Sequence, residues 1–131
     1  LGIDPRTAAL TSLPGSPFPL PLARTCGGLA LNRKPMMFAL ADVAGGADDV
    51  QALRRGRDGT LALLGVPQSS GLDRIDSGAL DATGRFLAVA SSGADQVRSF
   101  RVDTKSGQIA LADTEGANFG EDVNAVVFAR P

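Results

Sequence analysis

Charged and amide side chains recur along this chain at intervals of 48 or 49 residues. An arginine can hold a phosphate or carboxylate through two hydrogen bonds, and a carboxylate can activate a water molecule as a general base. The candidate residues are Arg24, Asp73, Arg74, Asp76, Glu121, Asp122 and Asn124. If their segments are copies of one structural unit, equivalent loops gather them around one opening. The alternative is that they are solvated loop charges, which pair weakly with one another.

Several other kinds of catalytic or metal site are disfavoured by the residues present. The chain has no histidine, which excludes a Ser–His–Asp triad, a Cys–His pair and a histidine metal site within it. Cys26 is the lone cysteine, and a small buried thiol is the favoured interpretation. Asp42, Asp48 and Asp49 could gather a cation, but aspartates at strand starts more often cap turns and protect sheet edges. We therefore expect no cofactor and no metal.

The composition indicates an all-β protein. The chain has 131 residues, a net charge of −1, 16 glycines and 8 prolines. No segment keeps a 3.6-residue apolar period over three turns, so we expect little or no helix. The near-zero charge gives no support for nucleic-acid or membrane-surface binding, and the apolar runs are too short to span a bilayer. A single cysteine does not fix the compartment; a cytoplasmic location is favoured, and a periplasmic one remains open.

A unit of about fifty residues is repeated in the sequence. Segments align at offsets of 47 to 49 residues: Leu31 with Leu80, MFALA (37–41) with FLAVA (86–90), and ADDVQAL (47–53) with ADQVRSF (94–100). One turn position is shared by Ala8, Gly59 and Gly107. A period of this length with four short strands predicts a β-propeller, whose blades are four-stranded antiparallel meanders.

We therefore predict about two complete blades with partial strands at each end. Residues 1–21 contain the end of a blade and a crossing, residues 22–65 and 66–113 form the two blades, and residues 114–131 contain a crossing and a closing inner strand over 123–129. The predicted strands of the two blades are 28–32, 36–42, 48–53, 60–64, 75–80, 85–91, 95–102 and 108–113. A slip in the alternation between Val97 and Phe100 predicts a bulge there.

The motifs resemble the lactonase-family seven-bladed β-propellers, which include the 6-phosphogluconolactonases of the cycloisomerase type. The segments that carry the resemblance are LALNRKPMMFALA, GALDATGRFLAVA, SSGADQVRSFRVDTKSGQIAL and LTSLPGSPF. The ending DVNAVVFARP looks like that family's C-terminal inner strand. The resemblance implies a C-terminal fragment, with missing N-terminal blades of the same chain completing the ring. The alternative is that several chains complete the ring together.

The resemblance also implies hydrolysis of a sugar lactone at the mouth of the propeller channel. By their positions alone, Asp73 or Glu121 could be the general base, and Arg74 or Arg24 could stabilise the developing oxyanion. The alternative is that the base or acid comes from the missing blades. Arg24, Asp76, Asp122 and Asn124 would bind the substrate. A non-catalytic propeller that serves as a binding or scaffold module is the alternative. A redox-cofactor propeller is a third possibility, disfavoured because tryptophan and histidine are absent.

Overall fold

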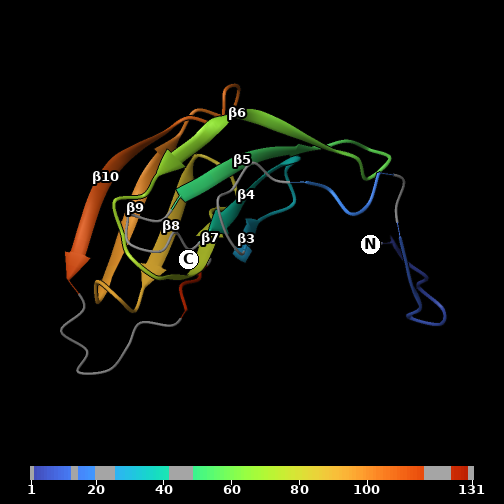
Figure 1. Cartoon of the computed structure of the whole chain (residues 1–131), viewed down its shortest axis with the longest axis horizontal. Coiled ribbons are helices and arrows are strands. Elements are labelled where there is room, and N and C mark those ends of the chain that lie inside the picture. Colours follow the sequence, from blue (N-terminus) through green and yellow to red (C-terminus); the bar gives the residue numbers. More distant parts are fainter. Residues whose placement is uncertain (1, 13–14, 20–25, 42–48, 117–124, 130–131) are drawn as a thin grey trace.

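The computed structural model of the chain describes residues 2–12, 15–19, 26–41, 49–116 and 125–129 (Figure 1). Within these residues the chain forms β-strands and no helix. The strands are β1 (Gly2–Ile3), β2 (Leu10–Thr11), β3 (Cys26–Leu31), β4 (Met36–Ala41), β5 (Asp49–Arg55), β6 (Leu61–Ser69), β7 (Ile75–Leu80), β8 (Phe86–Ser91), β9 (Gln96–Val102) and β10 (Ile109–Gly116). No helix long and apolar enough to cross a membrane occurs in this part of the chain.

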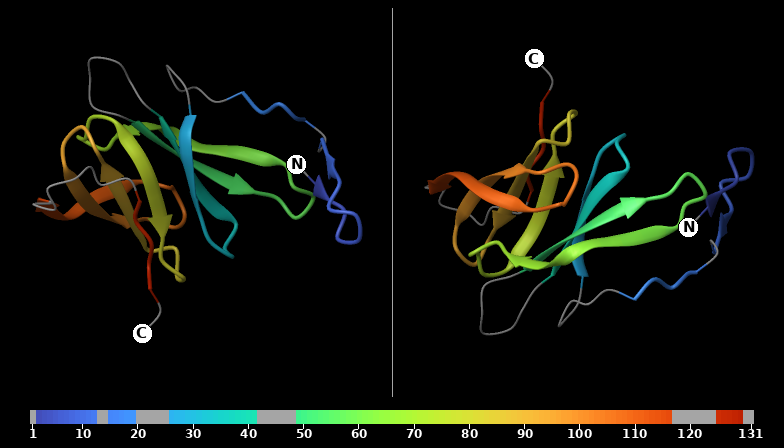
Figure 2. Two further views of the ribbon diagram at one scale, coloured as in Figure 1. Left: turned by 90° about the horizontal axis from the view of Figure 1, so that it is seen from below. Right: turned by 90° about the horizontal axis from the view of Figure 1, so that it is seen from above.

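The strands form two four-stranded antiparallel sheets and one short hairpin. The first sheet has the order β3-β4-β5-β6, the second has the order β7-β8-β9-β10, and β1 pairs with β2. In both sheets neighbours in space are neighbours in sequence, as in a meander. Figure 2 shows the two sheets side by side, with the inner strands β3 and β7 next to each other. The predicted all-β class with two blade-like sheets is confirmed.

The core lies between the two sheets. Phe38 and Leu40 of β4 are fully buried, and so are Leu87 and Val89 of β8. Each such side chain contributes about 1.5–3 kcal/mol when it is removed from water. Gly78 of β7 allows the sheets to approach, because an added Cβ there would lie only 2.9 Å from Leu40 Cδ1.

The hairpins that connect third and fourth strands show the predicted repetition in atomic detail. Ile3 pairs with Leu10 in the first hairpin, and Val102 pairs with Ile109 in the last, which is the same register 99 residues later. The residues predicted to share one turn position all have positive φ, namely Ala8 (57°), Gly59 (86°) and Gly107 (76°). The segments are therefore copies of one structural unit.

The predicted alignment of the second strands is wrong by one residue. Leu31 of β3 pairs with Met37 of β4, whereas Leu80 of β7 pairs with Leu87 of β8. Met37 is therefore the counterpart of Leu87 and not of Phe86. The β7–β8 connection holds one residue more than the β3–β4 connection, and apolar residues on both faces of these strands hide the alternation that would reveal it.

The outer strands are longer than predicted. β6 continues to Ser69 and β10 to Gly116, whereas the predicted strands end at residues 64 and 113. β6 has a bulge at residues 65–67, opposite Gln51 of β5. The side-chain N–H₂ of Gln51 donates to the carbonyl of Leu64 (3.1 Å). Pro67 fits in this bulge because no ladder N–H is required there.

The bulge expected in β9 lies in its neighbour. β8 and β9 pair without a register shift from Val97 to Phe100. Against β10, Phe100 pairs with Leu111 and Ser99 pairs with Asp113, so the extra residue is Ala112. Because β9 pairs regularly with β8, Val97 and Phe100 lie on opposite faces of the strand.

Residues 125–129 do not form the strand predicted over 123–129. The N–H of Val126 donates to Ser77 Oγ (3.0 Å), so the segment runs beside β7. It joins no ladder in the described part of the chain, and without a ladder partner an extended segment is not a strand. Residues 123 and 124 lie outside the described residues.

Candidate functional site

Three of the seven candidate residues lie in the described part of the chain. Asp73 and Arg74 immediately precede β7, and Asp76 is its second residue. The other four candidates lie outside the described residues: Arg24, Glu121, Asp122 and Asn124. The ring of equivalent positions therefore stays a prediction, and the geometry below belongs to the second sheet.

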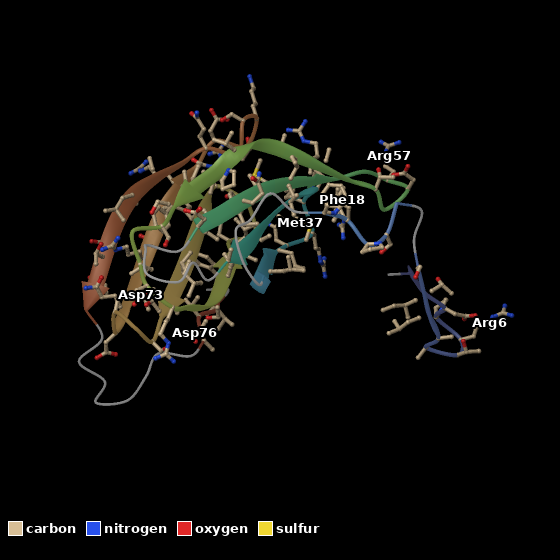
Figure 3. The ribbon with its side chains drawn as sticks, in the orientation of Figure 1. Arg6, Phe18, Met37, Arg57, Asp73 and Asp76 are labelled. Atoms are coloured by element: carbon tan, nitrogen blue, oxygen red, sulfur yellow. The ribbon has the colours of Figure 1, made fainter. Side chains whose placement is uncertain are left out.

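The start of β7 lies against the β8–β9 turn. The N–H of Ser92 donates to Asp76 Oδ2 (2.7 Å), and the hydroxyl of Ser91 donates to the carbonyl oxygen of Asp73. The N–H of Ala94 donates to Ser91 Oγ (2.9 Å), so Ser91 joins the two loops. Figure 3 shows Asp73 and Asp76 at the same end of the second sheet. The loop before an inner strand and the loop after a second strand thus form one polar surface.

The two loops touch so closely that only glycine fits at one position. An added Cβ at Gly93 would lie 2.9 Å from the Asp73 carbonyl oxygen and 3.0 Å from Arg74 Cβ. Arg74 has a φ of 53°, which is uncommon for a residue other than glycine. A backbone of this kind costs on the order of 1–3 kcal/mol and persists where the surroundings hold it. The hydrogen bonds of Ser91 and Ser92 supply that constraint.

The polar groups at this end of the second sheet differ in exposure and in hydrogen bonding. The Asp76 carboxylate is half-buried and holds the Ser92 N–H, so its first role is to fix the turn. Asp73 and Arg74 are exposed and offer a carboxylate and a guanidinium to solvent. The Ser92 hydroxyl is buried and has no hydrogen-bond partner among the described residues. The arrangement can therefore bind water and a polar ligand.

Sequence analysis missed Arg98 of β9, which supports the chain ahead of Asp73. Its Nη1 donates to the carbonyl of Ser70 (3.0 Å), and its Nη2 lies 3.5 Å from Gln96 Oε1. The guanidinium also fills the space beside Gly71 that a Cβ would occupy. An arginine in an alternating strand is ordinarily a solvated residue, and no signal in the sequence tells which main-chain carbonyl it will meet.

The aspartates that hold turns elsewhere are structural. Each accepts hydrogen bonds from its own turn: Asp4, Asp58, Asp81 and Asp103. Hydrogen bonds from main-chain N–H groups or a threonine hydroxyl lower the pKa of Asp4, Asp58 and Asp103 below the ordinary value. Among the residues described, no three acidic, histidine or cysteine side chains gather as metal ligands. Asp42 and Asp48 lie outside those residues.

Comparisons with known proteins give likenesses of fold. No model of a known protein family matches the chain, and no curated protein matches it. Among solved structures, the chain is similar to a periplasmic gluconolactonase of Pseudomonas aeruginosa, with 19% identity and a TM-score of 0.56 over 67% of this chain and 25% of that one.

Two further structures agree. A proposed 6-phosphogluconolactonase of Bacteroides fragilis matches with 20% identity and a TM-score of 0.51, over 59% of this chain and 21% of that one. Another from Bacteroides uniformis matches with 15% identity and a TM-score of 0.52, over 63% and 24%. The chain thus spans about a quarter of the length of the structures it matches. Its fold is similar to part of the fold of these three structures, in line with the resemblance that its motifs showed.

Proposed function

We propose that the chain is part of a β-propeller that hydrolyses a sugar lactone, of the 6-phosphogluconolactone type, where the segment before β7 meets the β8–β9 turn. The observation that carries this proposal is the contact between these two loops. Asp73 and Arg74 both belong to the first of these loops, directly before β7, and both side chains are exposed. The likeness of the fold to lactonase structures supports the choice of substrate class.

The proposed reaction requires a base and a cation. Asp73 takes a proton from water, whose oxygen then attacks the carbonyl carbon of the lactone. Arg74 stabilises the oxyanion that forms on the carbonyl oxygen. The bond from this carbon to the ring oxygen then breaks, the ring oxygen takes up a proton, and the open-chain aldonic acid leaves.

The remaining candidate residues complete the proposed site. Glu121 is a second carboxylate for the base. Substrate binding would fall to Arg24, Asp76, Asp122 and Asn124. In the alignment of the repeats, Arg24 matches Asp73, Asp122 matches Arg74, and Asn124 matches Asp76. Further blades of the same polypeptide would close the channel around this opening, which fits a chain that spans about a quarter of its structural neighbours.

A non-catalytic binding module is the second candidate. The observation that favours it is the use of the Asp76 carboxylate as a clamp on the Ser92 N–H, which leaves Asp73 as the exposed carboxylate among the three described candidates. A binding site needs no base, and a carboxylate with an arginine can simply hold a polyol or an acid sugar.

The test is lactone hydrolysis by the longer gene product that contains this chain. With 6-phosphoglucono-δ-lactone and glucono-δ-lactone as substrates, and with spontaneous opening subtracted, we expect turnover by the unaltered protein. Asp73→Asn removes the base and should lower kcat by about 10²–10⁴-fold. Arg74→Asn removes the cation, and asparagine tolerates the positive φ at this position.

The control is Asp103→Asn in the β9–β10 turn, at the other end of the second sheet, where Asp103 is exposed and an asparagine oxygen can still accept from the Lys105 N–H. It should leave kcat unchanged. Absence of turnover with both lactones would remove the enzymatic proposal. Lactone or aldonate binding that survives without turnover, and that weakens in Arg74→Asn, would establish the binding module instead.

A further inference from the structure

Four turns lie at the end of the two sheets that is opposite the candidate functional site. They connect β3 to β4, β5 to β6, β7 to β8 and β9 to β10, over residues 32–35, 55–60, 81–85 and 103–108. The candidate residues precede or begin β7, whereas the turn after β7 belongs to this other end. Figure 3 shows Arg57 of the β5–β6 turn far from Asp73 and Asp76. We call these four turns the basic end.

Two hydrogen bonds join the turns of the basic end across the two sheets. The Asn32 side chain of the β3–β4 turn donates to the carbonyl of Asp81 in the β7–β8 turn (2.6 Å). Arg54 Nη2, next to the β5–β6 turn, donates to the carbonyl of Lys105 in the β9–β10 turn (3.1 Å). The corresponding turns of the two sheets are therefore in direct contact.

Two further hydrogen bonds join the turns within each sheet. The N–H of Arg55 donates to the carbonyl of Pro35 (2.7 Å), and the N–H of Val102 donates to the carbonyl of Arg85 (2.8 Å). With the two contacts between the sheets, these bonds form a closed circuit through all four turns. The basic end is therefore one continuous surface, and its turns hold one another in place.

The basic end carries a charge opposite in sign to that of the whole chain. Its cations are all exposed: Arg33, Lys34, Arg55, Arg57, Arg85 and Lys105. Three aspartates accompany these six cations, which leaves a net charge of +3, whereas the whole chain has a net charge of −1. The small total charge of the sequence thus conceals a local excess of positive charge.

The three aspartates of the basic end are held by their own turns. Asp58 accepts from the N–H and hydroxyl of Thr60, Asp81 accepts from those of Thr83, and Asp103 accepts from the N–H of Lys105. None of the six cationic side chains donates a hydrogen bond to another residue that the structure describes. Their N–H groups are therefore available to an anionic partner.

The contact between the sheets does not cover these cations. The β3–β4 and β9–β10 turns meet the neighbouring sheet, and Arg33, Lys34 and Lys105 are nevertheless exposed. Packing of sheet against sheet takes place along the strands, and the turns project beyond it. The basic end therefore stays accessible where further repeats pack beside these two.

A cation also recurs at one position of the turn between third and fourth strands. Lys105 lies two residues before Gly107, and Arg57 lies two residues before Gly59, where both glycines have positive φ. Arg6 stands at the same distance from Ala8, the matching residue of the first hairpin. All three cations are exposed. Each copy of the repeat thus contributes a positive charge at this position.

The arrangement of the charges favours a broad anionic surface as the partner. Single-stranded nucleic acids are usually held by aromatic side chains on which the bases stack, and the four turns contain no aromatic residue. The cations are spread over four turns of two sheets rather than along one element, so a flat partner can meet several turns at once. Arginine and lysine near an anionic membrane surface are attracted to its headgroups, and guanidinium groups bind phosphate oxygens in pairs.

We propose that the basic end binds the surface of a lipid bilayer that contains anionic phospholipids. The arginines and lysines of the four turns contact headgroup phosphates without inserting into the hydrocarbon. The candidate site, at the other end of the sheets, is then turned toward the aqueous phase. This inference is independent of the proposed lactone chemistry, and its test measures binding rather than turnover.

The test is sedimentation of the longer gene product that contains this chain with lipid vesicles. We expect it to sediment with vesicles of phosphatidylcholine mixed with phosphatidylglycerol and to remain in solution with vesicles of phosphatidylcholine alone. Raising the salt from about 0.1 M to about 1 M shortens the Debye length from about 10 Å to about 3 Å and should release the protein. A DNA duplex added as competitor should displace it only weakly.

Two pairs of substitutions test one sheet each. Arg55→Gln with Arg57→Gln removes two cations from the first sheet, and Arg85→Gln with Lys105→Gln removes two from the second. Each cation near an anionic membrane contributes about fivefold in affinity, so each pair should weaken vesicle binding by roughly twentyfold to thirtyfold. All four residues are exposed, so the Tm of both variants should match that of the parent.

The matched control is Ala112→Glu with Thr114→Glu, at exposed positions of β10 outside the basic end. It lowers the net charge by the same two units as each pair and should leave vesicle binding nearly unchanged. Equal partition onto both kinds of vesicle, or substituted pairs that bind like the parent, would overturn the proposal. A control that binds as weakly as the pairs would show an effect of total charge, and tighter binding to the duplex than to the vesicles would assign the surface to nucleic acid; either result would also overturn it.

Discussion

Asp81 holds the turn between β7 and β8 through both of its carboxylate oxygens. Oδ2 accepts from the N–H (3.0 Å) and the hydroxyl (2.6 Å) of Thr83, and Oδ1 accepts from the N–H groups of Arg85 (2.8 Å) and Phe86 (2.9 Å). Burial is the largest influence on the pKa of Asp81 and raises it, but these hydrogen bonds together lower the pKa below its ordinary value. The ionised carboxylate is therefore the form that stabilises the turn.

Replacing Asp81 should make the fold less stable and less sensitive to acid. Asp81→Ala removes all four hydrogen bonds and should cost about 1–2 kcal/mol, comparable to the loss of a helix cap. In the parent, the contribution of Asp81 is complete above the unfolded pKa of about 3.9 and is lost as the pH falls through the lower folded pKa. The fall in Tm between pH 5 and pH 3 should therefore be smaller in Asp81→Ala.

The matched control for this prediction is Asp95→Ala. Asp95 is exposed in a turn, and its carboxylate accepts no hydrogen bond from the residues that the structure describes. It changes the net charge equally, so it measures the acid sensitivity that comes from charge alone. Equal acid sensitivity of the two variants would mean that the hydrogen bonds of Asp81 do not couple its ionisation to folding.

At the scale of elements, the hairpin between β9 and β10 packs against the first sheet. Gly107 lies directly on the first sheet: an added Cβ would lie 3.2 Å from Leu64 Cβ and would overlap Ala52 Cβ. The side chain of Gln68 closes the same contact through two hydrogen bonds. Gly107 is thus constrained in two separate ways. Its φ is positive, and it lies too close to the first sheet to carry a Cβ.

These two demands can be separated by comparing two substitutions. Gly65→Ala meets only the strain of a φ of 66°, since the nearest atom to its added Cβ is 3.9 Å away. It should cost about 1–2 kcal/mol. Gly107→Ala adds a clash in the core to the same strain and should cost about 1–3 kcal/mol more, measured by denaturant unfolding. Equal losses in the two variants would show that Gly107 does not bear on the contact between the sheets.

The sequence revealed the elements but not how they are aligned or supported. Repetition and alternation predicted the strands, and the shared turn position of Ala8 and Gly107 was correct because turn chemistry is local. The offset between β4 and β8 was wrong because both strands are apolar on both faces, so alternation gives no register. The role of Arg98 was missed because its partner, the carbonyl of Ser70, is 28 residues away and carries no side-chain signal.

At the scale of the molecule, equivalent rows of apolar residues run across both sheets. In the second sheet the row consists of Leu80, Leu87, Phe100 and Leu111, and in the first sheet it consists of Leu31, Met37, Leu53 and Leu63. The first three members of the second-sheet row are buried in the core against the first sheet. The first-sheet row faces away from that core. Its residues are nevertheless apolar, like those of the row that packs between the two sheets.

The first-sheet row should therefore make the 131-residue chain self-associate when it is studied alone. Leu31 is 56% exposed and Leu63 is 43% exposed. Because burial of each would contribute about 1 kcal/mol, Leu31→Lys with Leu63→Lys should weaken association by roughly tenfold to a hundredfold. Val66→Lys adds a charge at a more exposed apolar residue of β6, at 74%, that is not part of the row. Sedimentation equilibrium over a range of concentrations measures all three chains; a parent that stays monomeric, or a Val66→Lys variant that dissociates as readily as the double variant, would show that this row is not the surface that draws copies together.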